Sequence, residues 1–124
     1  MDIRAQDLSR LFGNSGIKRP YQDLDRLAKM IENADIILTA WDGERMVGIA
    51  RAITDYCYCC YLSDLAVDRD YQKLGIGKTL VDLLRQKIGD EVSLVLISAP
   101  SAMEYYPQIG FQPTDKAFVI PRVK

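Results

Sequence analysis

The sequence has 124 residues, of which 48% are apolar and 27% charged, and its formal net charge is −1. These values predict one soluble globular domain over 1–124 and argue against dominant nucleic-acid binding, which needs clustered lysine and arginine. No apolar run approaches the roughly 20 residues of a membrane-spanning helix. The N-terminal residues lack the apolar core of a signal peptide. We therefore expect a cytoplasmic protein that binds neither nucleic acid nor membrane.

The first half of the chain predicts two helices followed by an antiparallel hairpin. Apolar residues recur at helical spacing in both N-terminal segments, and proline favours the start of the second helix. Asp42-Gly43 between two apolar stretches is typical of a two-residue hairpin turn. The expected elements are a helix over 7–12, a helix after Pro20, and strands over 36–41 and 46–53.

The second half predicts a strand, a loop, a helix and a further strand in succession. A long strand over 57–67 precedes a helix over 76–88, and a nearly all-apolar run at 92–97 is typical of a central strand covered on both faces. One connecting helix makes these two strands parallel. The remaining expected elements are a short or distorted helix that starts at Pro100 with a Ser101–Glu104 capping box and meets Pro107, and final strands at Phe111 and 117–120. This order predicts an α/β fold with a mixed sheet and helices on both faces.

Residues 71–80 join the long strand to its helix and carry two glycines. The first amides of a helix lack internal partners and carry the positive end of its dipole, which favours an anion such as phosphate. Gly75 and Gly77 have no Cβ and allow close approach of backbone N–H groups, while Lys73 and Lys78 add cationic donors. The Walker pattern and the third glycine of the dinucleotide fingerprint are both missing. A glycine turn that merely starts the helix is the alternative.

The three cysteines lie together and the chain has no histidine. A structural zinc site needs four ligands, usually in two separated pairs, and three adjacent cysteines cannot supply them. The missing histidine also removes the Ser-His and Cys-His schemes of nucleophilic catalysis. We therefore expect no metal site and interpret Cys57, Cys59 and Cys60 as reduced structural residues.

The loop sequence matches the pattern Q/R-x-x-G-x-G and resembles the GCN5-related N-acetyltransferase (GNAT) superfamily from about Asp35 to Phe111. The resemblance implies a GNAT-like fold with a mostly antiparallel central sheet. Its first strand is short or missing here, since only residues 2–4 remain for it. It also implies that the loop holds the pyrophosphate of coenzyme A and that backbone groups of the preceding strand bind the pantetheine arm. The implied cofactor-binding residues are Leu65, Ala66, Val67, Gln72, Lys73, Leu74, Gly75, Ile76, Gly77 and Lys78.

A second segment, residues 102–111, resembles the family pattern A-x-x-F-Y-x-x-x-G-F. Tyr105 falls on the packing aromatic of that pattern and Tyr106 on the tyrosine that acts as general acid. A thiol of pKa about 8.5 is already a fair leaving group, so a tyrosine of pKa about 10 need only supply a proton late. A partly buried aromatic with a hydrogen-bonded hydroxyl is the alternative for Tyr106. Pro107 departs from the usual residue of the family.

A general base is harder to identify in the sequence. Asp64 lies on the strand beside the expected thioester and is the candidate for relaying a proton through water. The alternative is an ion pair with a basic neighbour such as Arg51. An amine that arrives neutral needs no such base, and positioning then supplies most of the rate.

These residues predict an N-acetyltransferase that moves an acetyl group from acetyl-CoA, its co-substrate, to a primary amine of a small molecule or peptide. A non-catalytic acyl-CoA sensor or interaction module is the second hypothesis, favoured by Pro107 and the reduced N-terminus, and an α/β domain without coenzyme A affinity is the third. The family's acceptor groove corresponds to residues 14–20 and 112–117, which carry no carboxylate cluster and so do not specify the acceptor. A homodimer through a free sheet edge is compatible with the sequence.

Overall fold

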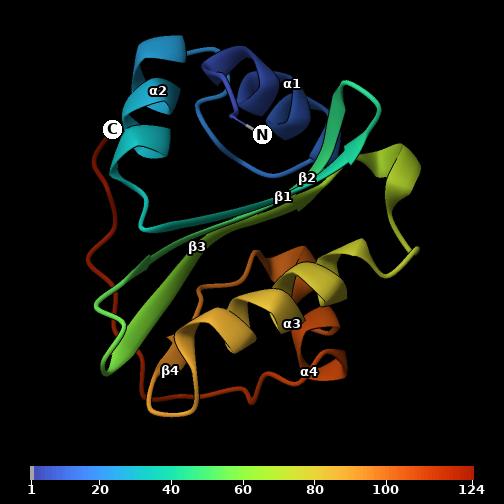
Figure 1. Ribbon diagram of the computed structural model, residues 1–124. Helices are drawn as coiled ribbons and strands as arrows, with labels where there is room; N and C mark the ends of the chain where they lie inside the picture. The colour runs from blue at the N-terminus through green and yellow to red at the C-terminus, as the bar shows by residue number, and fades with distance from the viewer. Residues whose placement is uncertain (1) are drawn as a thin grey trace.

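The computed structural model describes residues 2–124 and shows a four-stranded sheet between two helical layers (Figure 1). Two helices cover one face and two the other, which confirms the predicted α/β fold. The helices are α1 (Ala5–Ser15), α2 (Leu24–Asn33), α3 (Ile76–Ile88) and α4 (Tyr105–Gln108), with single 3-10 turns at Arg69–Tyr71 and Pro100–Ala102. The strands are β1 (Ile36–Asp42), β2 (Arg45–Thr54), β3 (Cys59–Val67) and β4 (Ser93–Val95). None of the helices in this part of the chain is long and apolar enough to cross a membrane.

The strands follow the order β1-β2-β3-β4, antiparallel except for the last pair. The hairpin between β1 and β2 turns at the predicted glycine, Gly43, whose φ of 60° lies in the left-handed region that glycine tolerates. β4 is parallel to β3, as the single connecting helix predicts. Residues 2–4 form no strand, so the described chain lacks the first strand that the family resemblance led us to expect short or missing.

Two apolar cores lie on the opposite faces of the sheet. The core under α3 contains the buried residues Ile36, Ala50, Ala52, Cys60, Leu62, Leu80, Val81, Leu84, Ile88 and Ile109. The core under α1 and α2 contains Leu8, Leu11, Phe12, Leu27, Met46, Ile49 and Ala66. The side chains that α3 buries recur at helical spacing, and Leu80, Leu84 and Ile88 belong to the pattern that predicted this helix, whereas Leu83 of that pattern is 43% exposed.

Gly48 on β2 lets the first turn of α3 lie close to the sheet. A Cβ at this position would stand 3.0 Å from Ile76 Cγ2 and 3.3 Å from Leu80 Cδ1. Replacing Gly48 with valine should therefore push the N-terminal turn of α3 outward. We expect a loss of about 1–3 kcal/mol in the free energy of unfolding, measured by urea denaturation.

Gly13 in α1 provides the matched control, because a Cβ there would meet Tyr21 at an ordinary 3.4 Å. Gly13→Ala should leave stability unchanged or raise it by up to about 1 kcal/mol, since alanine favours a helix interior. Equal losses for both variants would contradict the assigned role of Gly48.

The predicted central strand at 92–97 is wrong in position and length. β4 covers only Ser93–Val95 and lies at the edge of the sheet, with Val95 42% and Ile97 52% exposed. The final strands predicted at Phe111 and 117–120 are not formed either, and Phe118 and Ile120 are almost fully exposed. The apolar pattern predicted strands in both segments but did not specify a partner on each side.

Three helix boundaries differ from the predictions, and at α1 and α2 the reason is a cap that lies at another residue than the one used to place the boundary. α1 continues through Gly13 to a left-handed C-cap at Gly16, and α2 starts after Asp23, whose carboxylate accepts from Arg26 N–H at 3.1 Å. The Ser101–Glu104 capping box is absent, and the chain forms the 3-10 turn and the four-residue α4 instead. A short helix around Pro107 is present as predicted, but it starts at Tyr105 and not at Pro100.

Candidate active site

β3 and β4 separate after three paired residues. The ladder joins Cys59–Tyr61 to Ser93–Val95 and ends there, although β3 continues to Val67. Residues 62–67, apart from the unpaired Ser63, therefore pair with β2 on one side only. We call the unpaired side of these residues the open edge of β3. Unpaired backbone groups on such an edge can bind an extended, amide-bearing molecule.

Two of the three strand residues predicted to bind the pantetheine arm turn their backbone toward the open edge. Asp68 N–H donates to Val47 C=O on β2 at 2.8 Å. Backbone groups alternate in direction along a strand, so those of Ala66 face β2, whereas those of Leu65 and Val67 face away from it. The Val67 carbonyl accepts from Gln72 Nε2 at 2.9 Å, which leaves its N–H and both backbone groups of Leu65 on the open edge.

The loop after β3 leads into α3, whose N-terminus has no side-chain cap. Gly75 is the N-cap of α3 with φ 84°, and the first bond of the helix runs from Thr79 N–H to Gly75 C=O at 3.0 Å. The amides of residues 76–78 have no hydrogen-bond partner in the described chain. These three donors and the positive end of the dipole are the arrangement that favours a bound phosphate.

The backbone of this loop is strained at Lys73, the residue two positions before Gly75. Lys73 has φ 68°, and Tyr56 is the only other non-glycine residue with positive φ among residues 2–124. Such strain costs about 1–3 kcal/mol and concentrates at binding sites and clamps. Gln72 anchors the loop, because its side-chain Nε2 donates to the main-chain carbonyl groups of Val67 and Ser15. The other predicted cation, Lys78, pairs with Asp82 at 2.8 Å on the exposed surface of α3.

The two loop glycines meet different requirements. A Cβ on Gly75 would meet nothing within 4 Å, so this position needs glycine for its positive φ alone. A Cβ on Gly77 would lie 2.5 Å from the Tyr105 hydroxyl oxygen and 3.8 Å from Val67. Gly77 therefore permits α4 to approach the first turn of α3 beside the end of the open edge.

Tyr106 is half-buried on α4 and packs edge-to-face against two aromatic rings. The ring centroids of Tyr105 and Phe111 lie 5.3 and 5.5 Å away. Burial, and to a lesser degree Tyr105, raises the pKa of the Tyr106 hydroxyl above its usual value, while the positive charge of Arg19 opposes the increase. The hydroxyl is therefore protonated at neutral pH, which is the state that a general acid requires.

Asp64 is fully buried and accepts hydrogen bonds from two guanidinium groups. Arg19 Nε donates to one carboxylate oxygen at 2.5 Å, and Arg51 Nε makes a short bond to the other. Arg51 is itself buried and donates from Nη2 to the Ser63 hydroxyl at 2.9 Å. The ion pair with Arg51, which was the alternative to a proton-relay role, is thus present. A water molecule would have to compete with two cations for these oxygens.

Arg19 is a site residue that sequence reasoning missed. It lies in the loop of residues 16–23 between α1 and α2, and its Nη2 donates to Ser63 C=O at 2.7 Å. The segment 14–20 was expected to border the acceptor groove, but no sequence signal distinguishes Arg19 from the other arginines of the chain. Its partner is 45 residues away and becomes visible only in the fold. We call the region where Arg19, Ser63, Asp64 and Tyr106 lie the reactive end.

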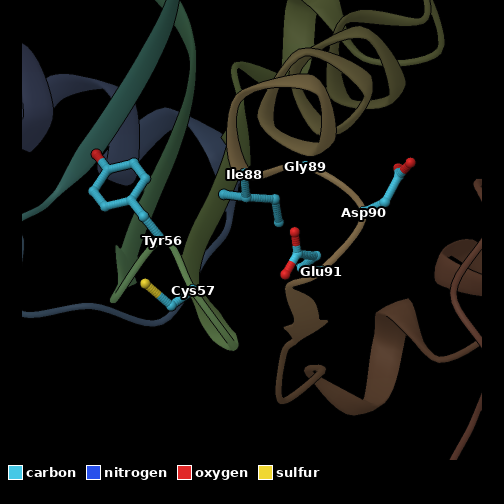
Figure 2. Close-up of a pocket in the computed structure, with 6 residues that line it drawn as sticks. All are labelled: Tyr56, Cys57, Ile88, Gly89, Asp90 and Glu91. Carbon is cyan, nitrogen blue, oxygen red and sulfur yellow. The ribbon is translucent and has the colours of Figure 1, made fainter.

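Two hollows of the surface lie away from these residues. One of about 290 Å³ is bordered by the β2–β3 turn and the chain after α3, where Tyr56 and Cys57 face residues 88–91 (Figure 2). A neighbouring one of about 570 Å³ lies along the C-terminal half of α3. No predicted site residue borders either of them. Among residues 2–124, no group of three or more histidine, cysteine or acidic residues is arranged to hold a metal ion.

Comparison with known proteins defines the class to which this fold and site belong. The family model for the acetyltransferase (GNAT) domain matches residues 9–120, and the chain therefore belongs to the GNAT family. A solved structure of a probable acetyltransferase from methicillin-resistant Staphylococcus aureus superposes with a TM-score of 0.84 at 25% identity, covering 98% of this chain and 93% of that one. A GNAT family protein from Streptococcus pneumoniae gives 0.72 at 21% identity, with 98% and 94% covered, and supports the fold alone.

The curated relatives are longer proteins. A probable acetyltransferase, TAP2, from Glycine max is 28% identical over 127 residues, which is 90% of this chain and 49% of the relative. A histone acetyltransferase, TAP1, from the same plant is also 28% identical, with 90% and 53% covered. The chain thus spans about half the length of these relatives.

Proposed function

We propose that this chain is an acetyl-CoA-dependent N-acetyltransferase that acts on a primary amine. The observation that carries the proposal is the continuity of the open edge with the N-terminus of α3. Backbone groups of Leu65 and Val67 face the gap beside β4, and beyond the end of the strand the loop reaches the free amides of residues 76–78. A pyrophosphate at the helix and an amide-bearing arm along the strand would lie in one line.

At the end away from α3, the open edge of β3 leads to the residues suited to the reaction. From Val67 to Ser63 a strand spans about 13 Å at roughly 3.3 Å per residue, and the segment leads from the phosphate loop toward Arg19 and Tyr106. We assign the donor pyrophosphate to Gly75, Ile76, Gly77 and Lys78, with Lys73 and Leu74 in the preceding turn. Gln72 and the Ala66 backbone support this loop and strand from within the protein.

In the proposed reaction the amine nitrogen attacks the thioester carbonyl carbon, a C–N bond forms and the C–S bond breaks. The sulfur leaves with the electron pair and takes the hydroxyl proton of Tyr106, the nitrogen loses its extra proton to water, and the tyrosinate recovers a proton from solvent. Asp64 has no assigned proton transfer, because both of its oxygens bind arginine. The amine then reacts in its neutral form, and the rate depends mainly on positioning.

The donor site is tested by titrating acetyl-CoA calorimetrically into the wild type and Gly77→Ala. We expect micromolar affinity for the wild type and about tenfold weaker binding for Gly77→Ala, a difference of about 1.4 kcal/mol. The added Cβ would lie 2.5 Å from the Tyr105 hydroxyl and would displace α4 or the first turn of α3. Adding Tyr105→Phe should recover part of the loss, because the ring carbon Cζ lies at 3.6 Å.

Gly89 supplies the control at the other end of α3. It also has a positive φ, 82°, and a Cβ added there would meet nothing within 4 Å, so Gly89→Ala should change stability but not acetyl-CoA affinity. A wild type that gives neither heat nor a thermal shift with acetyl-CoA would overturn the proposed function.

A non-catalytic acyl-CoA sensor is the second candidate. Two observations favour it: α4 is only four residues long around Pro107, and Asp64 is engaged by arginines. The two functions differ in turnover. Acetyl-CoA binding without thiol release, across a panel of small-molecule amines and lysine peptides, would establish the sensor.

The acceptor is proposed only as a primary amine of a small molecule or peptide. One neighbour of the fold is an aminoglycoside acetyltransferase solved with sisomicin, at 21% identity and a TM-score of 0.67, and one relative is named a histone acetyltransferase. These names justify including both an aminoglycoside and a histone peptide in the panel. We also propose a cytoplasmic location and a homodimer through the exposed edge of β4, which light scattering tests.

A further inference from the structure

We propose that Arg19 is a positioning residue that fixes the acceptor loop, residues 16–23, against β3 at the reactive end. The proposal rests on the proposed acetyltransferase function and assigns the residue that organises its acceptor side. Arg19 acts through other groups, because its three hydrogen bonds go to Asp64, Ser63 and Lys18.

Arg19 makes hydrogen bonds in three directions. Nε donates to Asp64 at 2.5 Å, Nη2 to Ser63 C=O at 2.7 Å, and Nη1 to Lys18 C=O at 2.6 Å. The first two join the loop to β3, and the third fixes the guanidinium against its own loop. A planar guanidinium loses little further freedom per bond, so one side chain can hold a loop in a single geometry.

The attachment point on β3 is a bulge. Arg51 pairs with Asp64 and the next residue of β2, Ala52, pairs with Leu62, so Ser63 is the extra residue without a partner. A bulge leaves the groups of its extra residue free and redirects neighbouring side chains. Here the Ser63 carbonyl binds Arg19 and its hydroxyl binds Arg51. The bulge at Ser63 is thus the point on β3 to which the acceptor loop is attached.

This attachment lies two residues from the open edge group Leu65, on the side away from the phosphate loop. The side chain of Arg19 is 28% exposed, whereas that of Asp64 is fully buried. Asp64 therefore anchors the arginine from inside the protein, while part of the arginine side chain stays exposed. An acceptor that enters over residues 16–23 would meet a loop whose position is set at this point.

The charge of Arg19 also acts on Tyr106. Burial is the main reason that the pKa of Tyr106 is raised, Tyr105 on α4 adds to the increase, and the positive charge of Arg19, from the loop between α1 and α2, opposes it. Behind Arg19 lie Asp64 on β3 and Arg51 on β2, so the three ionised side chains carry a net charge of +1.

The alternative is that Arg19 only stabilises the fold through a buried ion pair. The variants Arg19→Met and Arg19→Lys separate the two roles, with Arg26→Met as the control for an exposed arginine on the neighbouring α2. The measurements are kcat and KM for the best acceptor, the affinity for acetyl-CoA, the pH profile of kcat/KM, and hydrogen exchange of residues 16–23.

For Arg19→Met we expect the acceptor KM to rise about tenfold, equivalent to about 1.4 kcal/mol, with acetyl-CoA affinity unchanged within about twofold. The alkaline limb of kcat/KM should move to higher pH, because loss of the cation raises the pKa of Tyr106. Arg19→Lys keeps the positive charge but loses the planar guanidinium with its several donors. The acceptor KM should therefore rise, while the alkaline limb of kcat/KM stays at the wild-type pH. Arg26→Met should match the wild type in all four measurements.

Amide exchange of residues 16–23 should accelerate in Arg19→Met, and this readout needs no turnover. Lower thermal stability with unchanged exchange in the loop and unchanged KM and pH limb would overturn the positioning role. Faster loop exchange in a protein that acetylates no acceptor would instead leave the attachment intact and defeat the proposed function. The two failures are therefore distinguishable.

Discussion

Replacing Asp64 with alanine is expected to lower the free energy of unfolding by about 3–5 kcal/mol, measured by urea denaturation. The carboxylate has no exposed surface and accepts from both Arg19 and Arg51. Its removal leaves the guanidinium of Arg51, only 7% exposed, without its counter-ion. An uncompensated buried charge is among the most destabilising changes a single substitution can make.

The exposed pair between Lys78 and Asp82 is the matched control, with side chains 57% and 39% exposed. Asp82→Ala should cost no more than about 0.5 kcal/mol, as for other exposed helix pairs. The double variant Asp64→Leu with Arg51→Met should be more stable than Asp64→Ala, because both buried charges are then removed. A loss below about 1 kcal/mol for Asp64→Ala would contradict the structure of this cluster.

Replacing Tyr106 with phenylalanine is expected to reduce kcat about 100-fold, at the lower end of the range for general acid catalysis. The lower end applies because a thiolate with a conjugate acid of pKa about 8.5 leaves readily without full proton transfer. Phenylalanine preserves the edge-to-face contacts with Tyr105 and Phe111, so stability and acetyl-CoA affinity should change little. The rate is followed as thiol release at saturating acetyl-CoA.

Tyr105→Phe is the control, because it removes a neighbouring hydroxyl that faces Gly77 instead of the reactive end. It should retain most of the wild-type kcat. The alkaline limb of the pH profile should disappear in Tyr106→Phe, since the titrating acid is gone. Full activity in Tyr106→Phe would remove the general acid from the mechanism and return Tyr106 to a packing role.

Elements specified by local sequence were the ones predicted well. The bounds of α3 coincide with the predicted 76–88, because Gly75 before it and Gly89 after it act as caps and the buried residues recur at 3.6-residue spacing. The β1–β2 hairpin followed from Asp42-Gly43 in the same way. The loop between β3 and α3 was predicted from these same local signals, since a strand, two glycines and a helix follow one another without interruption.

Features that depend on distant parts of the chain could not be predicted. An apolar run at 92–97 does not say whether a neighbour lies on its outer side, and in the described chain none does. The partnership of Arg19 with Asp64 joins residues 45 apart, and the bulge at Ser63 depends on the register with β2. The reason that position 77 requires glycine likewise comes from α4, which follows much later in the chain.

The contact between Gly77 and Tyr105 links two positions that belong to separate family motifs. A side chain at 77 and a phenol hydroxyl at 105 would occupy the same space, 2.5 Å apart. Homologous chains should therefore vary at these positions jointly, so that a residue with a Cβ at 77 occurs with a shorter or non-phenolic side chain at 105. The residues at 77 and 105 thus share one space, so that a substitution in one motif limits which residues the other motif can carry.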